Sequence, residues 1–265
     1  MVSARLDLTG VLRPVRAGNA FEETVERLLT VVKLGVVGPG ERFPAERELA
    51  AQLGISRLTL REAIRELQQA GYVESRRGRF GGTFVTYRPP APDAAELRRM
   101  AIHDGDKLAD ALTFQLVVEA GAAETLATLM ARASQAAGGA LAGCGPAGTA
   151  AAGNARQDPR EVLLARLTEV NAASPRDYRR LDTLFHLSIA ELTGSSLLAT
   201  ACTDARMRLN GLLNALPVLR RNINHTAGQH TAMVVAILAG DAQAARHAVA
   251  EHLDGTAALL RAFLA

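Results

Sequence analysis

The sequence of 265 residues contains no tryptophan and only two cysteines, and aromatic residues make up 4% of it. Cys144 and Cys202 lie far apart and form no C-x-x-C motif, so a disulfide is not implied and a reducing compartment is expected. No stretch reaches the roughly 18 apolar residues of a membrane span, and the N-terminus lacks a signal-peptide pattern. We therefore expect a soluble, cytoplasmic protein with no membrane partner.

Strand-forming stretches are also scarce, because alanine and leucine dominate the 48% of residues that are hydrophobic. The length is sufficient for two compact domains. Charge divides unevenly between the two halves. Residues 1–88 hold 14 Lys+Arg and 10 Asp+Glu, a balance of +4, whereas residues 89–265 hold 16 and 17, a balance of −1. The basic first part weakly indicates a polyanionic partner.

The order of elements in the first part is typical of a winged helix-turn-helix. An N-x-x-E signal at Asn19 predicts a helix over 20–34, and Pro44 and Gly54 bracket a short helix over 45–52. Ser56 can cap a helix over 57–70, and the β-prone segment 72–87 surrounds a glycine-rich turn, which predicts a hairpin.

The helix over 57–70 has the pattern of a DNA-recognition helix. Its apolar positions can face inward, while Arg57, Thr59 and Arg61 lie at or near the first turn and point outward. Arginine suits both guanine edges and phosphate. Arg47 on the preceding helix could contact phosphate, and the arginines around Gly78 could approach the DNA backbone or minor groove from the hairpin.

The segment FPAERELAAQLGISRLTLREAIRELQQAGYVESRRGRFGGTFV closely resembles the winged-helix domain of the GntR family of bacterial transcription regulators. The resemblance covers about residues 14–87. It implies a DNA-binding domain over 14–88, followed by a linker over 89–105 and a second domain over 106–265. The DNA contacts that it implies are made by Arg47, Ser56, Arg57, Thr59, Arg61, Arg77 and Gly78.

The remainder of the chain has helical patterns almost throughout. We predict helices over 108–134, 159–171, 175–193, 196–214, 218–239 and 242–264. The Gly/Ala-rich insert over 135–157 has few large side chains to bury, which predicts a long flexible loop. The fold class is therefore mainly α, with an N-terminal winged helix-turn-helix and a C-terminal, all-helical antiparallel bundle.

One predicted helix carries polar residues on its apolar face. In the segment RLDTLFHLSIAEL, Asp182, Phe185, His186 and Ile189 share one face. A buried carboxylate needs a partner, because an unpaired buried charge costs several kcal/mol. His186 could be that partner, and an Asp–His pair alone is more often a structural hydrogen bond than a ligand set.

Two further histidines are placed to converge on this pair. His230 lies ten residues before Gly240 and His252 lies eleven residues after Asp241, so in an antiparallel hairpin they stand at similar height. His225 and His247 lie about 140° further around their helices and should point elsewhere. A carboxylate with three imidazoles suits a divalent first-row metal, so Asp182, His186, His230 and His252 are predicted metal ligands.

This D-x-x-x-H pattern with two later histidines resembles the FCD ligand-binding domain of the FadR subfamily. The resemblance covers about residues 105–265 and implies a helical bundle that holds Zn²⁺ or Ni²⁺ beside a cavity for a small organic acid. Many relatives have E-x-R-x-x-x-E on the first helix, but this chain reads TFQLVVE. Gln115 therefore replaces the arginine, and Arg206 or Arg208 could compensate, although a solvated arginine is the commoner case. Gln115 and Arg206 are the predicted effector-binding residues.

These observations predict a homodimeric transcription regulator, a repressor by the usual mode of the family, that binds a pseudo-palindromic DNA operator. A small, carboxylate effector at the metal site would change operator affinity. Three alternatives stay open: a regulator in which the ion itself is the signal, a structural metal without effector, and a metal-dependent hydrolase. The hydrolase lacks a positioned base such as H-E-x-x-H, so we do not expect an enzyme.

Overall fold

A computed structural model of the chain describes residues 20–79, 81–88, 105–140, 158–215 and 220–264. The predicted cap Asn19, the linker residues 89–104 and the insert residues 141–157 lie outside these ranges. Within them, none of the helices combines the length and the apolar character that crossing a membrane requires. The predicted fold class is confirmed, because helices dominate and a two-stranded sheet is found only in the N-terminal part of the described chain.

The N-terminal part folds as a winged helix. Helices α1 (Ala20–Lys33), α2 (Glu46–Leu53) and α3 (Arg57–Gln69) are followed by the strands β1 (Val73–Arg76) and β2 (Gly82–Val85). The two strands are antiparallel, with Val73 opposite Val85 and Arg76 opposite Gly82. Each fully buried leucine of this core contributes roughly 1.5–3 kcal/mol. The core includes Leu28, Leu49, Leu53, Leu60 and Leu67.

The helix boundaries in this part follow from local chemistry. Gly54 ends α2 in the left-handed conformation, with φ of 65°, and returns its N–H to the carbonyls of Ala50 and Ala51. Ser56 caps α3, because its hydroxyl accepts the N–H of Thr59 at 3.0 Å. The turn between α2 and α3 is therefore short and fixed, and it sets the direction in which the first turn of α3 presents its side chains.

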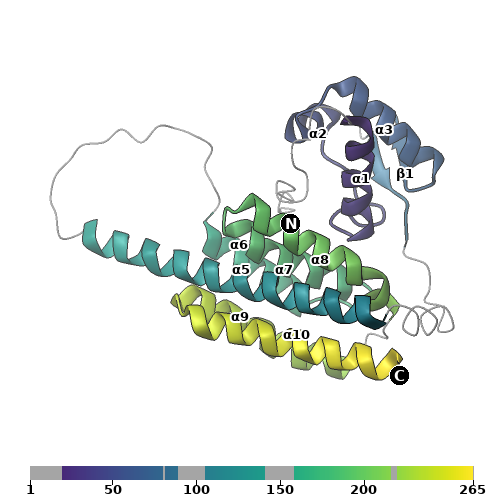
Figure 1. The fold of residues 1–265 in the computed structure, drawn as a ribbon. Helices are drawn as coiled ribbons and strands as arrows, with labels where there is room; N and C mark the ends of the chain where they lie inside the picture. The colour runs from purple at the N-terminus through teal and green to yellow at the C-terminus, as the bar shows by residue number, and fades with distance from the viewer. Residues whose placement is uncertain (1–19, 80, 89–104, 141–157, 216–219, 265) are drawn as a thin grey trace.

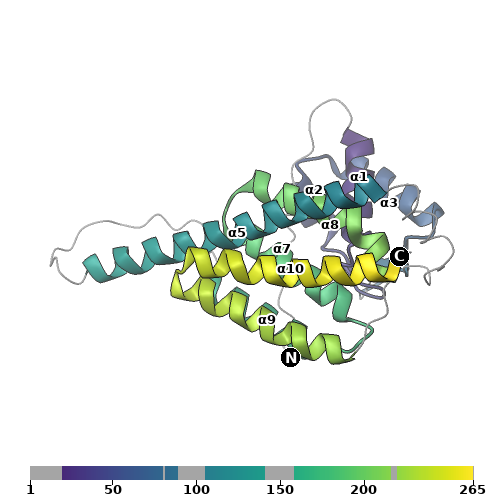
Figure 2. The ribbon, with the colours of Figure 1, turned by 60° about the horizontal axis from the view of Figure 1, so that its bottom comes forward.

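The C-terminal part is a helical bundle. It consists of α5 (Gly105–Ala140), α6 (Pro159–Asn171), α7 (Tyr178–Leu192), α8 (Ser196–Ala215), α9 (Arg220–Ala239) and α10 (Ala242–Leu264). The long helix α5 packs against α7, α8, α9 and α10. Figure 1 shows α5 spanning the bundle, with the hairpin of α9 and α10 along one side and α6, α7 and α8 along the other. The same arrangement is seen from a second direction in Figure 2.

Three predicted boundaries were wrong by three residues or more, and one of them is the start of α5, which begins at Gly105 instead of 108. Helix α5 continues to Ala140 instead of ending at 134, because the alanines of this stretch favour helix despite its glycines. Helix α7 begins at Tyr178 instead of 175. The hydroxyl of Ser174 donates to the Asp177 carboxylate at 2.7 Å and accepts the Asp177 N–H at 3.2 Å, which holds this segment in a turn before the helix starts.

Candidate metal centre and nucleic-acid interface

Five of the seven predicted DNA-contact residues come from α2 and from the start of α3. Arg47 on α2 and Ser56 and Arg57 at the start of α3 are exposed, and Thr59 in the first turn of α3 is half-buried. The side chains of Arg57 and Arg61 are each 58% exposed. The apolar residues of α3 face inward as predicted, since Leu60, Ile64 and Leu67 are buried. The first turn of α3 therefore presents polar and basic side chains to solvent.

Sequence reasoning missed a carboxylate on this surface. Glu46, the first residue of α2, accepts a hydrogen bond from Nε of Arg61 at 2.8 Å and lies 3.8 Å from the guanidinium of Arg57. It gathers the two arginines that the sequence assigns to base or phosphate contacts. The carboxylate of Glu46 therefore offsets part of the positive charge that Arg57 and Arg61 present on this surface.

The wing offers a second, smaller basic surface. Arg77 and Gly78 are exposed at the tip between β1 and β2, where Gly78 has φ of 103°, a conformation that other residues rarely adopt. Arg76 is less available, because its guanidinium pairs with Glu74 and lies 4.4 Å from the centre of the Phe84 ring. Of these two wing arginines, Arg77 is therefore the better placed to reach DNA.

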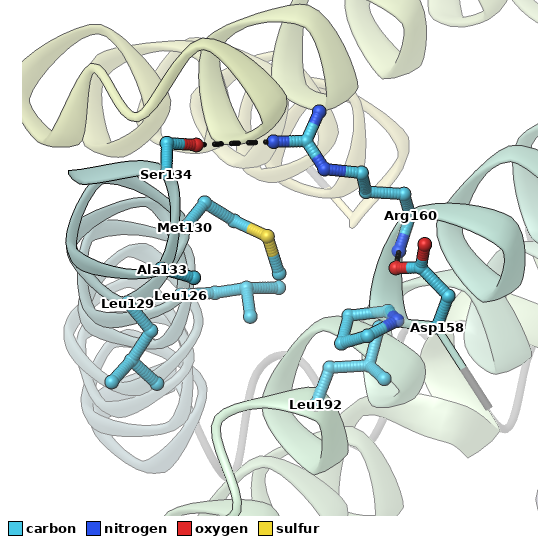
Figure 3. A pocket seen from close by; sticks show the side chains of 9 residues that line it. Leu126, Leu129, Met130, Ala133, Ser134, Asp158, Arg160 and Leu192 are labelled. Carbon is cyan, nitrogen blue, oxygen red and sulfur yellow. Dashed lines mark hydrogen bonds between the residues drawn. The ribbon is translucent and has the colours of Figure 1, made fainter. Parts of the chain in front are cut away.

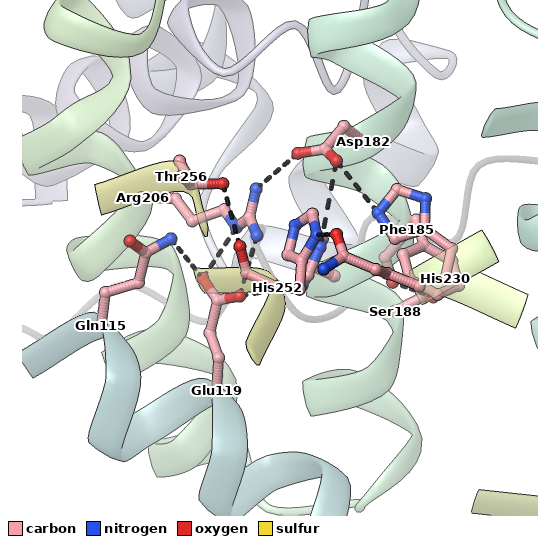
Figure 4. A network of polar contacts seen from close by, with 11 residues as sticks. Gln115, Glu119, Asp182, Phe185, Ser188, Arg206, His230, His252 and Thr256 are labelled. Carbon is pink, nitrogen blue, oxygen red and sulfur yellow. Dashed lines mark hydrogen bonds and ion pairs between the residues drawn. The ribbon is translucent and has the colours of Figure 1, made fainter. Parts of the chain in front are cut away.

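The four predicted metal ligands meet inside the bundle. Asp182 and His186 come from α7, His230 from α9 and His252 from α10, and one ligand atom of each lies within 4.8 Å of all the others. The three imidazoles are buried, and the Asp182 side chain is 15% exposed. Nε2 of His230 and Nε2 of His186 lie 3.2 Å and 3.9 Å from the same oxygen, Oδ1 of Asp182. Figure 4 shows how the side chains of Asp182, His230 and His252 approach one another.

The neighbours of two imidazoles determine which ring nitrogen carries the proton. Nδ1 of His186 lies 2.9 Å from the Glu119 carboxylate, and Nδ1 of His252 lies 3.2 Å from the amide oxygen of Gln229. Carboxylate and amide oxygens only accept, so in each ring Nδ1 donates. The lone pair is then left on Nε2, the nitrogen turned toward the cluster. A neutral imidazole oriented in this way is what metal coordination requires.

A buried arginine joins the two carboxylates of the site. Arg206 on α8 is 3% exposed. It donates from Nε and Nη2 to Glu119, at 2.8 Å each, and from Nη1 to Asp182 at 3.0 Å. The expectation of a solvated arginine was therefore wrong for Arg206 and holds for Arg208, which is exposed. Gln115 is also buried and donates to Glu119 at 2.9 Å.

The electrostatics keep both carboxylates ionised and the imidazoles of His186 and His252 neutral. Burial alone would raise the pKa of Asp182, but its hydrogen bond with His230, the neighbouring His186 ring and the charge of Arg206 hold it well below its usual value. Arg206 and His186 likewise hold the pKa of Glu119 low against the effect of burial. Burial lowers the pKa of His186 and of His252, so that both rings are neutral near pH 7.

The hydrogen bonding of the ring nitrogens also fits a metal ion. Nε2 of His186 and both ring nitrogens of His230 are buried without a well-formed hydrogen bond, although both Nε2 atoms face Oδ1 of Asp182. Buried polar atoms are nearly always satisfied, so two neighbouring rings whose Nε2 atoms have no well-formed hydrogen bond indicate a missing partner. That partner must accept lone pairs and tolerate a carboxylate, which are the properties of a divalent cation. His225 and His247 are exposed, as their helical spacing predicted.

Sequence reasoning missed Glu119 and Gln229 as partners of the imidazoles. Glu119 could have been found, because it lies one helical turn after Gln115 on the same face of α5, and a carboxylate on an apolar face needs a cationic partner. Its link to Arg206 joins residues 87 positions apart. No local pattern in the sequence indicates that pairing.

A separate pocket of about 360 Å³ opens between α5, α6 and α7 (Figure 3). Its walls are mostly apolar, and Arg160 closes one side by donating to Ser134 at 3.3 Å. None of its lining residues belongs to the polar cluster, the name we give to Asp182, His186, His230 and His252 with their partners Glu119 and Arg206. The residues that form its walls are Leu126, Leu129, Met130, Ala133, Ser134, Asp158, Pro159, Arg160 and Leu192.

Comparison with known proteins finds two family models that match different parts of the chain. Residues 21–85 match the family described as bacterial regulatory proteins, gntR family, and residues 145–255 match the FCD domain. An Escherichia coli K12 protein named for regulation of the L-lactate dehydrogenase operon is 28% identical over 251 residues, which cover 88% of this chain and 83% of that protein. The Uxu operon transcriptional regulator of the same organism is 28% identical over 254 residues, covering 90% and 85%.

Two other similarities are more limited. RmpR of Mycobacterium gastri, which is named as an HTH-type transcriptional regulator, is 49% identical over 65 residues, and this match spans 24% of each chain. The structure of Streptococcus agalactiae GntR aligns with a TM-score of 0.41 at 21% identity, covering 90% of this chain and 99% of that one.

A winged helix that exposes arginines, followed by a helical bundle with a buried ligand-type cluster, defines a DNA-binding transcription regulator with a regulatory domain. The chain belongs to the GntR family of bacterial regulatory proteins and carries an FCD effector-binding domain behind its DNA-binding domain. Its relatives are named as regulators of transcription, which confirms the expectation that the protein is not an enzyme.

Proposed function

We propose that this regulator is a repressor whose affinity for its operator changes when a small carboxylate binds at a divalent metal in the FCD domain. The observation that carries the proposal is the buried set of one carboxylate and three imidazoles, with ring nitrogens that have no well-formed hydrogen bond within the protein. Asp182, His186, His230 and His252 would hold the ion. The ion would supply a fixed positive charge with open coordination positions for oxygen ligands.

The donor set favours zinc or nickel. Imidazole nitrogens suit first-row metals such as Zn²⁺ and Ni²⁺, whereas Ca²⁺ and Mg²⁺ prefer sites made of oxygen atoms. Glu119 and Gln229 hold the His186 and His252 rings in the required tautomer. Such outer partners typically change metal affinity 10–100-fold when they are mutated.

The charge balance of the cluster favours an anionic effector. With neutral imidazoles, Glu119, Asp182 and Arg206 together carry a charge of −1, and a divalent cation would change it to +1. A single carboxylate would restore neutrality in a buried site, where an uncompensated charge is costly. The relative named for L-lactate dehydrogenase regulation is linked by that name to a hydroxy acid, which is of the same chemical class.

Effector contacts by Gln115 and Arg206 stay predictions. In the described structure both side chains are bound to Glu119, and Arg206 also binds Asp182. We expect Arg206 to act chiefly by orienting Asp182. It holds Oδ2 and leaves Oδ1 directed at the histidines.

On DNA, we propose that two copies of the chain bind a pseudo-palindromic operator. Arg47, Ser56, Arg57, Thr59, Arg61, Arg77 and Gly78 are the proposed contact residues. A symmetric dimer matches a two-fold symmetric operator, and the separation of its two recognition helices sets the half-site spacing. An effector that changes that separation changes operator affinity.

Elemental analysis of purified protein tests the metal site. We expect about one equivalent of zinc or nickel per chain in the wild type and loss of the metal in the double variant His230→Ala, His252→Ala. The matched control is His225→Ala, His247→Ala, which removes two exposed histidines from the same helices and should retain the metal. Full occupancy in the first variant would contradict the proposed ligand set.

Operator binding tests the effector. A set of small carboxylic acids, including lactate, is titrated against the protein–DNA complex with the metal present and after chelation. We expect a carboxylate to weaken DNA binding only in the metal-loaded protein. If the metal ion alone changes DNA affinity and no acid has a further effect, the protein is a metal sensor and not an acid-responsive repressor.

A further inference from the structure

The turn between α1 and α2 contacts the first turn of α7. Nη1 of Arg180 lies 3.5 Å from Oε1 of Glu41, and the other oxygen of Glu41 accepts the backbone N–H of Gly38 at 2.8 Å. One side chain of the helical domain therefore engages a carboxylate that in turn closes the turn of the winged helix. We call this region, where α7 of the helical domain meets the segment before α2 of the winged helix, the seam.

Two glycines of this turn make room for the Arg180 side chain. A Cβ atom at Gly35 would lie 2.9 Å from Cγ of Arg180, and one at Gly38 would lie 3.2 Å from its Cδ. Gly35 also has φ of 71°, which a larger residue rarely adopts, whereas Gly38 does not have a positive φ. The stem of Arg180 thus lies in a slot whose walls are two residues without side chains.

A second contact joins α8 to the end of α1. Nδ2 of Asn210 donates to the backbone oxygen of Lys33, the last residue of α1, at 2.8 Å. The C-terminal carbonyls of a helix have no partner within the helix, so this bond satisfies one of them. Helices α1 and α8 are also in backbone proximity along this seam, and Figure 1 shows α1 above the bundle beside α8.

Both contacts originate on the helices that hold the polar cluster. Arg180 lies two residues before Asp182 on α7, on the opposite side of the helix. Asn210 lies one turn after Arg206 on α8, on the same side. Asp182 and Arg206 are bonded to each other at 3.0 Å. A helix moves nearly as a rigid body, so a displacement at either residue of this ion pair is carried to the seam.

We propose that Arg180 and Asn210 dock the winged helix on the helical domain, and that docking is loosened when a cation shares Asp182 with Arg206. The second half of this inference rests on the proposed function. A divalent cation at Oδ1 of Asp182 repels the guanidinium on Oδ2, and this guanidinium is fixed to the helix that carries Asn210. Ion binding and docking therefore oppose each other. Binding of the ion at the metal site would in this way change the position of the winged helix, and with it the recognition helix, through the contacts of the seam.

The docking contacts have the strength that a switch requires. The side chains of Arg180 and Glu41 are 24% and 41% exposed, so their attraction is screened by solvent. The hydrogen bond of Asn210 can be replaced by water. Contacts of this kind can be made and released without unfolding either domain, whereas the Arg206 network lies in the core and cannot.

Hydrogen exchange of the full-length, metal-free chain tests docking. We expect the amide of Gly38 and its neighbours over 33–41 to exchange about tenfold faster in the variant Arg180→Ala, Asn210→Ala than in the wild type. Arg176→Ala, which removes an exposed arginine just before α7, is the matched control and should leave this exchange unchanged. Equal exchange in the double variant and the control would overturn docking.

Zinc affinity tests the coupling in the reverse direction, because linkage between two sites is reciprocal. Gly38→Ala narrows the slot for Arg180 without backbone strain, and Gly255→Ala, with open space around it, is its control. We expect Gly38→Ala to bind Zn²⁺ about threefold or more tightly than the control. We also expect Zn²⁺ to speed exchange at Gly38 in the wild type. Equal affinities, or weaker binding by Gly38→Ala, would overturn the coupling.

Failure of the proposed function would look different. If the wild type takes up no zinc, the metal site is absent, but exchange at 33–41 still reports docking. Asp182→Asn then tests the coupling without any ion, because it weakens the hold of Arg206 and should speed exchange at Gly38. An unchanged rate in a folded Asp182→Asn protein would overturn the link between the cluster and the seam.

Discussion

Arg57 on the recognition helix and Arg206 in the helical domain are the same residue type in opposite surroundings. Arg57 is 58% exposed and lies 3.8 Å from one carboxylate, whereas Arg206 is 3% exposed and donates hydrogen bonds to two. An exposed arginine can exchange its partner for DNA at little cost, because water and phosphate both solvate its charge. A buried one is fixed, because removing a partner leaves an uncompensated charge. The DNA-binding surface is therefore built to exchange partners and the cluster is built to hold its geometry.

The strongest test of this comparison is Arg206→Met. It removes the cation between Glu119 and Asp182 and leaves two ionised carboxylates buried close together. We expect the free energy of unfolding of the metal-free protein to fall by about 3–5 kcal/mol, as measured by urea denaturation. Arg208→Ala, at an exposed position two residues further along α8, should change the free energy of unfolding by less than about 0.5 kcal/mol. Similar values for the two variants would show that the cluster is not a structural unit.

Acidification should lower the free energy of unfolding through the buried cluster, by less than Arg206→Met does. The pKa values of His186 and His252 are lowered by burial, so the unfolded chain takes up protons before the folded one does. Stability is then fully present above pH 6.5 and is lost as the pH falls below it, while the low pKa values of Asp182 and Glu119 add a further loss below about pH 4. Thermal unfolding of metal-free protein between pH 7.5 and 5 measures this. The variant His225→Ala, His247→Ala should show the same profile, because its changes are confined to exposed rings.

Arg57→Ala should weaken DNA binding and leave the fold intact. The loss of one base or phosphate contact costs about 1–3 kcal/mol of binding free energy. Selection from random-sequence DNA supplies an operator, and footprinting compares the variant with Arg132→Ala, an exposed arginine of α5. An unchanged footprint for Arg57→Ala would refute the assignment of α3 as the recognition helix. Unchanged thermal stability in both variants is part of the expectation, because both side chains are exposed.

The smallest expected effect is that of Ser56→Ala. It removes the hydroxyl that accepts the Thr59 N–H and should lower the free energy of unfolding by about 1 kcal/mol. Ser75→Ala, an exposed position on β1, is the control. A stability equal to that of the control would mean that the start of α3 is fixed by packing and not by its cap, and that the recognition surface depends less on local chemistry than the comparison requires.

Most of the winged helix could be predicted because its signals are local. The helix ends follow from Gly54 and Ser56, and the buried face follows from the helical spacing of apolar residues along 57–69. Each of these signals acts within a few residues of its own position. The convergence of His230 and His252 was also predictable, because counting from the turn at Gly240 places both at one height. The predicted ligands stand together in the structure for that reason, although their binding of a metal stays a prediction.

The sequence by itself determined which helices form, which faces they bury and which four side chains could share an ion. Helical periodicity and capping act over a few residues, and a linear pattern records them. Only the tertiary structure decided that Glu119 fixes the tautomer of His186, that Arg206 is buried between two carboxylates and that Arg180 lies in a slot on the winged helix. Those pairings join residues that are distant in the chain, and they form because a buried charge must find its partner wherever packing places one.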